Sequence, residues 1–189
     1  MPPKAKFTRD EIVEAALNIV KRDGLEALTS RALGEQLGSS ARPIFTVFNN
    51  MDEVQQAVIK SAKTLYKEYV NKGLNEIHPF KGVGMQYILF SVNEPKLFQL
   101  LFMTEQPQMP DFSGVLPLIE ESYEEILLSI QKDYGVNKIL AERLYHHLWI
   151  YTHGIAALCA TKMCRFTGIE ISSMITEVYT SILKNIKSS

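Results

Sequence analysis

The chain has 189 residues, of which 46% are hydrophobic, and a formal net charge of −1 at pH 7. This composition is typical of a folded protein with a substantial core, and its net charge by itself gives no support to a nucleic-acid-binding function. No apolar run is long enough to span a bilayer and the N-terminal residues lack the apolar stretch of a signal peptide, so we expect a cytoplasmic protein.

The first predicted helix begins near Arg9. Thr8 and Glu11 have the spacing of a capping box, in which each side chain satisfies the backbone amide of the other residue. Apolar residues then recur at steps of three and four, and Gly24 supplies a left-handed stop.

Two shorter helices are predicted next, separated by a tight turn. Thr29 or Ser30 caps the first of them, which ends at Gly38, and Ser40 caps the second. Pro43 is compatible with the first turn of that helix, because amides there have no intrahelical partner.

Three short helices with this turn predict a helix-turn-helix, the arrangement that presents a helix to the major groove of DNA. The third helix directs Arg42 and Thr46 outward as candidate base readers. Other residues of the motif and of the N-terminal arm are expected beside phosphates or thymine methyl groups. The predicted DNA-contacting set is Lys4, Lys6, Arg9, Thr29, Arg31, Ser39, Ser40, Arg42, Pro43, Phe45, Thr46 and Asn49.

Charge favours this interpretation through its placement. Lys4, Lys6 and Arg9 precede the first acidic residue, and Arg31 and Arg42 lie on the two helices of the motif. The alternative is an ordinary solvated surface, which would not require charge and motif to coincide.

The run from Thr29 to Val54 resembles the N-terminal domain of TetR-family transcriptional regulators. In that family the motif ends in an aromatic residue, two variable positions and Phe, then a polar pair and an acidic cap; the matching residues here are Phe45, Thr46-Val47, Phe48, Asn49-Asn50 and Asp52-Glu53. The chain departs from the family at Phe45, Val47 and Met51, where Tyr, His and Lys are usual and would touch phosphate. The departures leave open how the DNA backbone is gripped.

The remainder of the chain has the periodicity of helices. A capping box from Asn50 to Glu53 starts a long helix that runs from about Asp52 to Asn75. Further periodic segments, separated by Gly, Pro and Asn breaks, cover residues 81–93, 95–103, 115–134, 137–167 and 172–187. We therefore predict an all-α chain of about nine helices, with a DNA-binding domain over residues 1–51 and an effector-binding and dimerisation domain over residues 52–189.

Aromatic and Met side chains are dense between Phe80 and Tyr151, which predicts either an apolar cavity or a dry core. The run from Trp149 to Gly154 resembles the Trp, His, Gly signature of one TetR C-terminal subgroup. That resemblance implies a domain that binds a small-molecule effector, here an apolar or aromatic one. The predicted ligand-binding residues are Tyr87, Phe90, Phe98, Phe102, Tyr123, Tyr145, Trp149 and His153.

An apolar stripe on the last helix and small residues on the helix before it predict a four-helix bundle across a twofold axis. Burial within one subunit is the alternative. A dimer is favoured because two reading helices reach successive major grooves. The predicted interface is Ala156, Ala160, Met174, Ile175, Val178 and Ile182.

Signals for catalysis, a metal or a cofactor are weak. Glu142, His146 and His153 lie one and two turns apart on one helix face and could hold a metal, but such residues are more often polar members of a helix surface. Gly82-Val83-Gly84 lacks the third glycine and the preceding strand of a dinucleotide-binding loop. We expect no enzyme activity, no cofactor and no metal.

The two cysteines, Cys159 and Cys164, lie five residues apart in one predicted helix. A rise of about 1.5 Å per residue and different helix faces would place their Cα atoms too far apart for a disulfide. Both are expected to be reduced thiols.

The sequence therefore predicts a homodimeric regulator that binds a palindromic operator and responds to a ligand, with repression as the usual outcome in the family it resembles. An effector would favour one dimer geometry and so change the spacing of the two reading helices. A second hypothesis is a small-molecule sensor with weakened DNA binding, which Phe45, Val47 and Met51 favour. A third, an all-helical enzyme, rests only on the weak Glu and His constellation.

Overall fold

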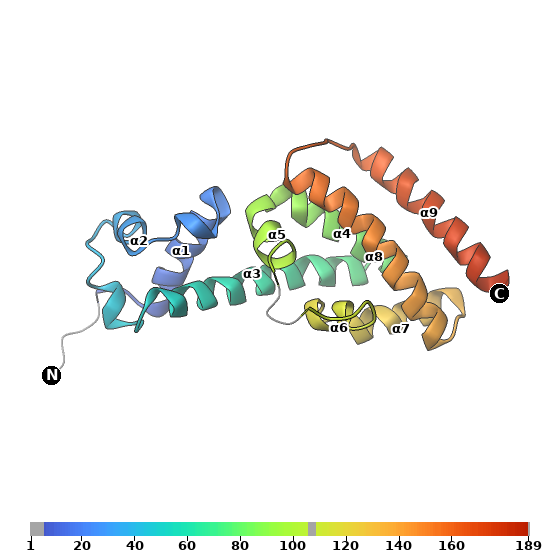
Figure 1. The fold of residues 1–189 in the computed structure, drawn as a ribbon, viewed down its shortest axis with the longest axis horizontal. Helices are drawn as coiled ribbons and strands as arrows, with labels where there is room; N and C mark the ends of the chain where they lie inside the picture. The colour runs from blue at the N-terminus through green and yellow to red at the C-terminus, as the bar shows by residue number, and fades with distance from the viewer. Residues whose placement is uncertain (1–5, 106–108, 189) are drawn as a thin grey trace. The chain divides into compact units, whose positions relative to one another are not determined.

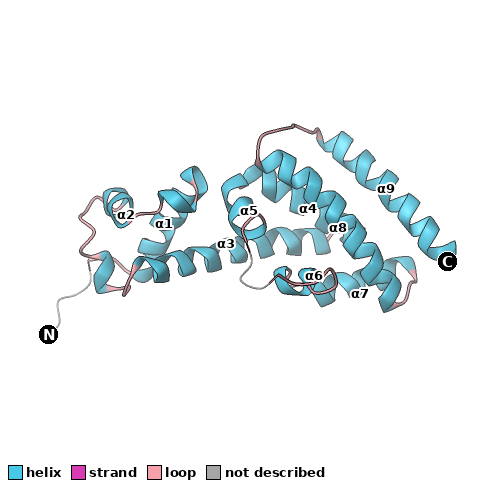
Figure 2. Cartoon of the chain, in the orientation of Figure 1, coloured by secondary structure: helices cyan, strands magenta, loops and turns pink. Residues whose placement is uncertain are grey.

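The computed structural model describes residues 6–105 and 109–188, and the regular elements in these ranges are all helical (Figures 1 and 2). The nine α-helices within them confirm the predicted all-α class. None of the described helices is both long enough and apolar enough to cross a membrane. The elements are α1 Arg9–Asp23, η1 Leu25–Ala27, α2 Ser30–Gln36, η2 Ile44–Thr46, α3 Met51–Leu74, α4 Pro79–Asn93, α5 Pro95–Phe102, α6 Val115–Ile119, α7 Tyr123–Tyr134, α8 Lys138–Ala160 and α9 Gly168–Ser188, where η marks a 3-10 helix.

The chain folds into two compact units. The first comprises Met1–Leu65 and Lys96–Thr104, and the second comprises Tyr66–Pro95 and Glu105–Ser189. The domain boundary predicted between residues 51 and 52 lies at the start of α3, a helix that contributes residues to both units. α5 belongs to the first unit, although it follows α4 of the second in the chain.

The core of the first unit is built from α1, α2, η2, α3 and α5. The amphipathic stripe predicted in α1 is buried, because its apolar residues recur on one side of the helix. α3 adds an apolar residue at every fourth position of its first half. The buried side chains include Ile12, Ala16, Ile19, Val20, Leu33, Ile44, Phe48, Val54, Val58, Ala62, Leu97 and Phe98. Burial of an Ile, Val, Leu or Phe side chain contributes about 1.5–3 kcal/mol, so this set supplies the main apolar contribution to the stability of the first unit.

The second unit is a helical bundle in which α8 packs against α4, α7 and α9. α3 and α4 approach each other closely at two glycines. A Cβ atom placed on Gly73 would lie 2.5 Å from the Val83 amide nitrogen, and one on Gly82 would clash with the Gly73 carbonyl oxygen. Gly82 is therefore needed for helix packing. This explains a glycine that belongs to no dinucleotide-binding loop.

The prediction of a single helix over residues 115–134 is wrong, because the structure has two helices there. α6 ends at Ile119 and α7 begins at Tyr123, with Glu120 between them. The buried carboxylate of Glu120 accepts hydrogen bonds from the Tyr66 hydroxyl at 2.7 Å and from the Ser122 amide at 3.0 Å. A buried carboxylate requires hydrogen-bond donors such as these. The helix is interrupted at the residue whose carboxylate they bind.

The last two helices also differ from their predicted bounds. The segment predicted over residues 137–167 ends as a helix at Ala160, and α9 begins at Gly168 instead of 172. The Thr167 amide donates to the Glu170 carboxylate at 2.7 Å, and the Glu170 amide donates to the Thr167 hydroxyl at 3.2 Å. These contacts form a capping box, and its Thr-x-x-Glu pattern was available in the sequence.

Candidate nucleic-acid interface

The first helix of the motif is fixed at both ends by the predicted residues. The Thr8 amide donates to the Glu11 carboxylate at 2.7 Å, and the Glu11 amide donates to the Thr8 hydroxyl at 3.2 Å. Hydrogen bonds from the Thr8 amide and hydroxyl hold the pKa of the Glu11 carboxyl below its usual value. Gly24 ends the helix with a φ of 92°, a region that favours glycine.

The turn after α2 packs directly on that helix. The Thr29 hydroxyl accepts from the Ala32 amide at 3.1 Å and starts α2, which confirms Thr29 as the cap. Gly38 has a φ of 61°, and the Ser39 amide donates to the Gly34 carbonyl at 2.9 Å. A Cβ atom on Gly34 would lie 3.0 Å from the Ala41 amide nitrogen. Because glycine has no Cβ atom, the turn can approach α2 closely at this position.

The third helix of the motif is not the α-helix that the sequence predicted. Turn residues lead into η2, a 3-10 helix of three residues, Ile44–Thr46. The Ile44 and Val47 amides each donate to the carbonyl three residues earlier, at 3.1 Å. Ile44 and Phe48 are buried, and Pro43 precedes them without an amide hydrogen to donate.

This turn presents several of the predicted contact residues to solvent. Arg42, Thr46 and Ser40 are exposed. Phe45 leaves 46% of its surface exposed, although its ring is apolar. The Thr46 hydroxyl donates to the Pro43 carbonyl at 2.7 Å, which fixes its direction. Arg42 and Phe45 are therefore the exposed side chains with the longest reach on this segment.

The N-terminal arm is attached to the same segment. The ammonium group of Lys6 donates to the Ser39 hydroxyl at 2.9 Å. The guanidinium of Arg9 lies 4.2 Å from the centre of the Phe48 ring, a cation–π contact. The predicted contact residue Lys4 lies outside the described residues.

Two other predicted contact residues have acidic partners. Arg31 pairs with Glu35 at 3.0 Å on the exposed face of α2. The amide and side-chain nitrogens of Asn49 donate to the Glu53 carboxylate at 2.9 and 2.6 Å. These bonds, first the backbone one and then the side-chain one, lower the pKa of the Glu53 carboxyl. The Asn50 side chain accepts from the Glu53 amide and caps α3, as predicted. The Glu53 carboxylate, however, accepts from Asn49 instead of from the Asn50 amide.

A groove of about 650 Å³ lies at the N-terminal ends of α1 and α3. It is lined by Arg9, Asp10, Val13, Asn50, Asp52, Glu53, Gln56, Ala57, Lys60 and Ser61. Three carboxylates against two cationic side chains make this groove a poor site for phosphate. The side of the first unit that carries Lys6, Ser39 and Arg42 is better suited to DNA.

The predicted ligand-binding residues divide between the two units. Phe98 and Phe102 pack on each other in the first unit, with ring centres 5.2 Å apart. The other members lie in the second unit, where their rings also contact one another. Tyr123 stacks on Tyr145 at 5.7 Å, and Trp149 lies 5.4 Å from His153. The remaining members of this second group are Tyr87 and Phe90.

A hydrogen bond joins two members of the second group. The Tyr87 hydroxyl lies 2.8 Å from the His153 Nδ1 atom. Burial raises the pKa of the Tyr87 phenol and lowers the pKa of the His153 imidazole. Both shifts favour neutral side chains at pH 7, so the pair is a polar contact without charge.

The histidines of α8 are engaged separately. His146 Nδ1 lies 2.8 Å from the Glu142 carbonyl oxygen, whereas His153 is bonded to Tyr87. The His146 Nε2 atom is buried without a hydrogen-bond partner among the residues that the structure describes, and the Phe112 ring lies 4.8 Å from the imidazole. In the part of the chain that the structure describes, no group of three His, Cys, Asp or Glu side chains is placed to hold a metal ion.

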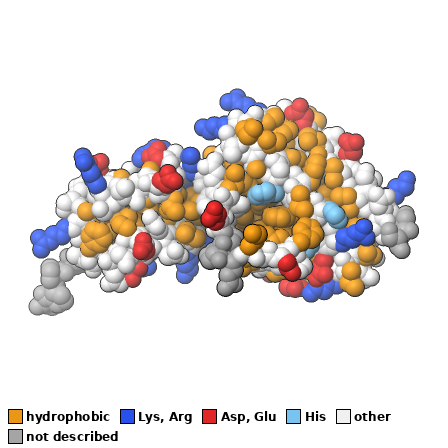
Figure 3. All heavy atoms as spheres, in the orientation of Figure 1, with side chains coloured by type: hydrophobic (Ala, Val, Ile, Leu, Met, Phe, Trp, Pro, Cys, Tyr) orange, Lys and Arg blue, Asp and Glu red, His pale blue; other side chains and the backbone are white. Residues whose placement is uncertain are grey.

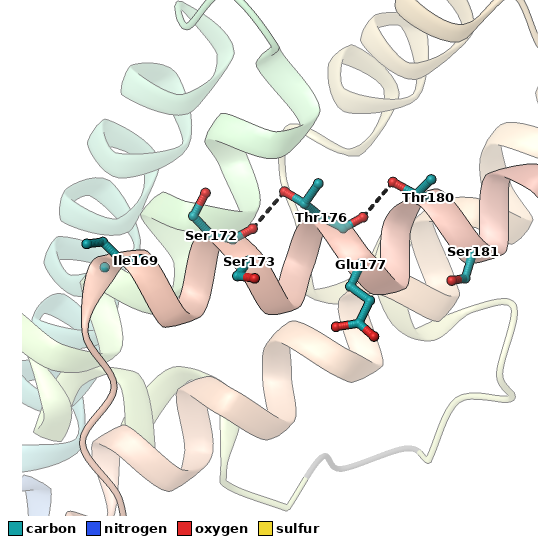
Figure 4. A pocket seen from close by; sticks show the side chains of 8 residues that line it. Ile169, Ser172, Ser173, Thr176, Glu177, Thr180 and Ser181 are labelled. Carbon is teal, nitrogen blue, oxygen red and sulfur yellow. Dashed lines mark hydrogen bonds between the residues drawn. The ribbon is translucent and has the colours of Figure 1, made fainter.

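The residues predicted to form the dimer interface are already wholly or partly buried within the single chain. Ala156, Ala160 and Ile175 are buried, and Met174, Val178 and Ile182 are half-buried. A shallow groove of about 790 Å³ runs along α9 (Figure 4). Its lining residues are Gly168, Ile169, Ser172, Ser173, Thr176, Glu177, Thr180 and Ser181. The Thr176 and Thr180 hydroxyls each donate to a carbonyl one turn earlier at 2.7 Å, so this face presents small residues with satisfied hydroxyls.

Comparison with known proteins gives one informative match. The chain is 35% identical over 54 residues to an uncharacterized HTH-type transcriptional regulator, Rv0681, of Mycobacterium tuberculosis. The match covers 29% of this chain and a quarter of the length of that relative. No family model matches the chain.

Proposed function

We propose that this protein is a DNA-binding transcriptional regulator of the helix-turn-helix type. The observation that carries the proposal is the turn after α2, which contains exposed Arg42 and also Ser39, whose hydroxyl accepts a hydrogen bond from Lys6 of the N-terminal arm. Cations and hydroxyls on an exposed turn are the groups that contact phosphates and base edges. The 54-residue similarity to an HTH-type transcriptional regulator supports the same function.

Within this proposal, the chain works as a TetR-like homodimer on a palindromic operator. One reading turn spans too few base pairs for useful specificity, whereas two related by a twofold axis reach successive major grooves. The resemblance of residues 29–54 to the TetR DNA-binding domain supports this assembly. Repression would follow if the operator overlaps a promoter.

The dimer surface would be formed by the outward sides of α8 and α9. Figure 3 shows hydrophobic side chains gathered over the second unit, with histidine among them. Ile150 of α8 is 50% exposed, and one turn later Gly154 is open to a close helix approach. We expect Ile150→Glu to give a monomer by light scattering. Ile77→Glu, at a residue 90% exposed and outside both helices, is the matched control and should leave the mass unchanged.

The effector would bind among the aromatic side chains of the second unit. His146 Nε2 and Gln86 Oε1 are buried polar atoms with no hydrogen-bond partner in the described part of the chain, and a ligand could satisfy them. An apolar or aromatic guest should then quench Trp149 and raise the melting temperature over one concentration range. A broad apolar library that produces neither response would remove the effector from the proposal.

A small-molecule sensor with weak DNA binding is the second candidate function. It is favoured by the short η2 turn in place of a full reading helix, and by Asn49, whose side chain is held by Glu53. Electrophoretic mobility of the purified protein with its own upstream DNA separates the two candidates. A shifted band that competitor DNA of unrelated sequence fails to abolish supports the regulator, and an unshifted band supports the sensor.

A further inference from the structure

The chain reverses direction at the end of α8. The Lys162 amide donates to the Cys159 carbonyl and the Met163 amide to the Leu158 carbonyl, both at 3.0 Å. Lys162 has a φ of 59°, so it occupies the left-handed position of a Schellman motif, which is usually glycine.

This reversal brings the two cysteines of the chain together. The Cys164 amide nitrogen lies 3.3 Å from the Leu158 carbonyl oxygen, and that oxygen belongs to the peptide group that ends at the Cys159 nitrogen. Bond lengths and the planar peptide group then limit the two cysteine Cα atoms to a separation of about 7.5 Å, a limit that includes the range a disulfide bridges. Disulfides join Cα atoms about 4.4–6.8 Å apart. A larger Cα–Cα separation is expected if both cysteines lie in one helix, as the sequence predicts. In the structure only Cys159 belongs to α8.

The two thiols differ in accessibility. Cys164 is exposed and its thiol donates to the Arg165 carbonyl at 3.7 Å, whereas Cys159 is half-buried. Burial, and then the nearby Cys164, raise the pKa of the Cys159 thiol. An oxidant from solvent should therefore meet the exposed Cys164 sulfur first.

We propose that Cys164 and Cys159 are a modification site, at which a hydroperoxide converts the two thiols into an intramolecular disulfide. The Cys164 thiolate attacks the peroxide, the O–O bond breaks, and water or an alcohol leaves as Cys164 becomes a sulfenic acid. The Cys159 sulfur then attacks the Cys164 sulfur, and the S–O bond breaks. The hydroxyl leaves with the Cys159 thiol proton as water, so the peroxide gains the two electrons that the thiols lose.

The bond would close a covalent loop across the Schellman motif. It would hold the C-terminal end of α8, the helix that carries Trp149 and His153, to the start of the segment that leads into α9. This inference does not depend on DNA binding.

The test treats the full-length protein with hydrogen peroxide and measures intact mass, thiol alkylation and chain mobility on a non-reducing gel. We expect both thiols to be lost together, with the mass of a single chain reduced by two hydrogen atoms. In Cys164→Ser the Cys159 thiol should remain alkylatable, and in Cys159→Ser a sulfenic acid should accumulate at Cys164 and react with dimedone. Oxidation of wild-type Cys164 while Cys159 stays alkylatable would overturn the proposal, and so would a disulfide that joins two chains.

Discussion

The ammonium group of Lys6 lies 2.9 Å from the hydroxyl of Ser39, which ties the N-terminal arm to the turn after α2. A cation fixed at this point should neutralise one phosphate and release its counterion when DNA binds. Lys6→Ala should therefore reduce the slope of log affinity against log salt by about 1. Lys132→Ala, at an exposed residue of α7, is the control and should keep the wild-type slope. An unchanged slope in Lys6→Ala would show that the arm does not touch DNA.

Arg42 is the exposed cation of the η2 turn and should read a base edge. Arg42→Ala should weaken binding to a preferred duplex by about 1–3 kcal/mol and relax the preference at one position per half-site. Fluorescence anisotropy with duplexes substituted one base pair at a time measures both effects. Arg143→Ala, at an exposed residue of α8, should change neither. A uniform loss over all sequences would instead assign Arg42 to a phosphate.

Two glycines of α4 give a matched test of helix packing. A Cβ atom on Gly82 would clash with the Gly73 carbonyl, whereas one on Gly84 meets only Thr152 Cγ2 at 3.6 Å. Gly82→Ala should lower the free energy of unfolding by about 1–3 kcal/mol. Gly84→Ala should raise it by up to about 1 kcal/mol, because alanine favours the helix. Urea denaturation of both variants measures the difference, and equal effects would contradict the close approach of α3 and α4.

The buried Glu120 carboxylate makes stability depend on pH. Burial raises the pKa of this carboxyl in the folded protein, despite the hydrogen bond from Tyr66. The ionised form is then disfavoured by folding, so its contribution to stability falls as pH rises from about 4.5 through the folded pKa. Glu120→Gln removes the charge and keeps one acceptor oxygen, which can take the bond from the Ser122 amide, while its amide nitrogen can donate to the Tyr66 hydroxyl.

We therefore expect Glu120→Gln to gain stability over the wild type as pH increases from 4.5 to neutrality. Urea denaturation at several pH values measures the difference in unfolding free energy between the two proteins. The pH dependence that comes from their shared titratable groups cancels in this difference. Glu125→Gln, on the exposed side of α7, is the control and should follow the wild type. A difference that is constant with pH would contradict the raised pKa.

Features that depend on a few neighbouring residues were predictable from sequence. The capping box of Thr8 and Glu11, the cap at Thr29 and the stop at Gly24 follow from local backbone chemistry, and the structure contains all three. The helical class follows from apolar periodicity for the same reason.

Features that depend on distant residues were not predictable. The break at Glu120 requires Tyr66, which lies 54 positions away in the chain. Phe98 was grouped with the aromatic residues of the second unit, but α5 packs in the first. The segment Ile44–Thr46 forms a 3-10 helix instead of a full α-helix, and the spacing of four between buried Ile44 and Phe48 fits an α-helix as well, so periodicity alone does not separate the two.

Selection from a random pool of double-stranded DNA with the full-length protein tests the proposed function most directly. A helix-turn-helix dimer should enrich an inverted repeat whose half-sites lie about one helical turn, or a multiple of it, from centre to centre. Binding to that repeat should exceed binding to unrelated duplexes and weaken as salt increases. A pool that remains random after repeated rounds, while the protein stays folded, would contradict a DNA-binding regulator.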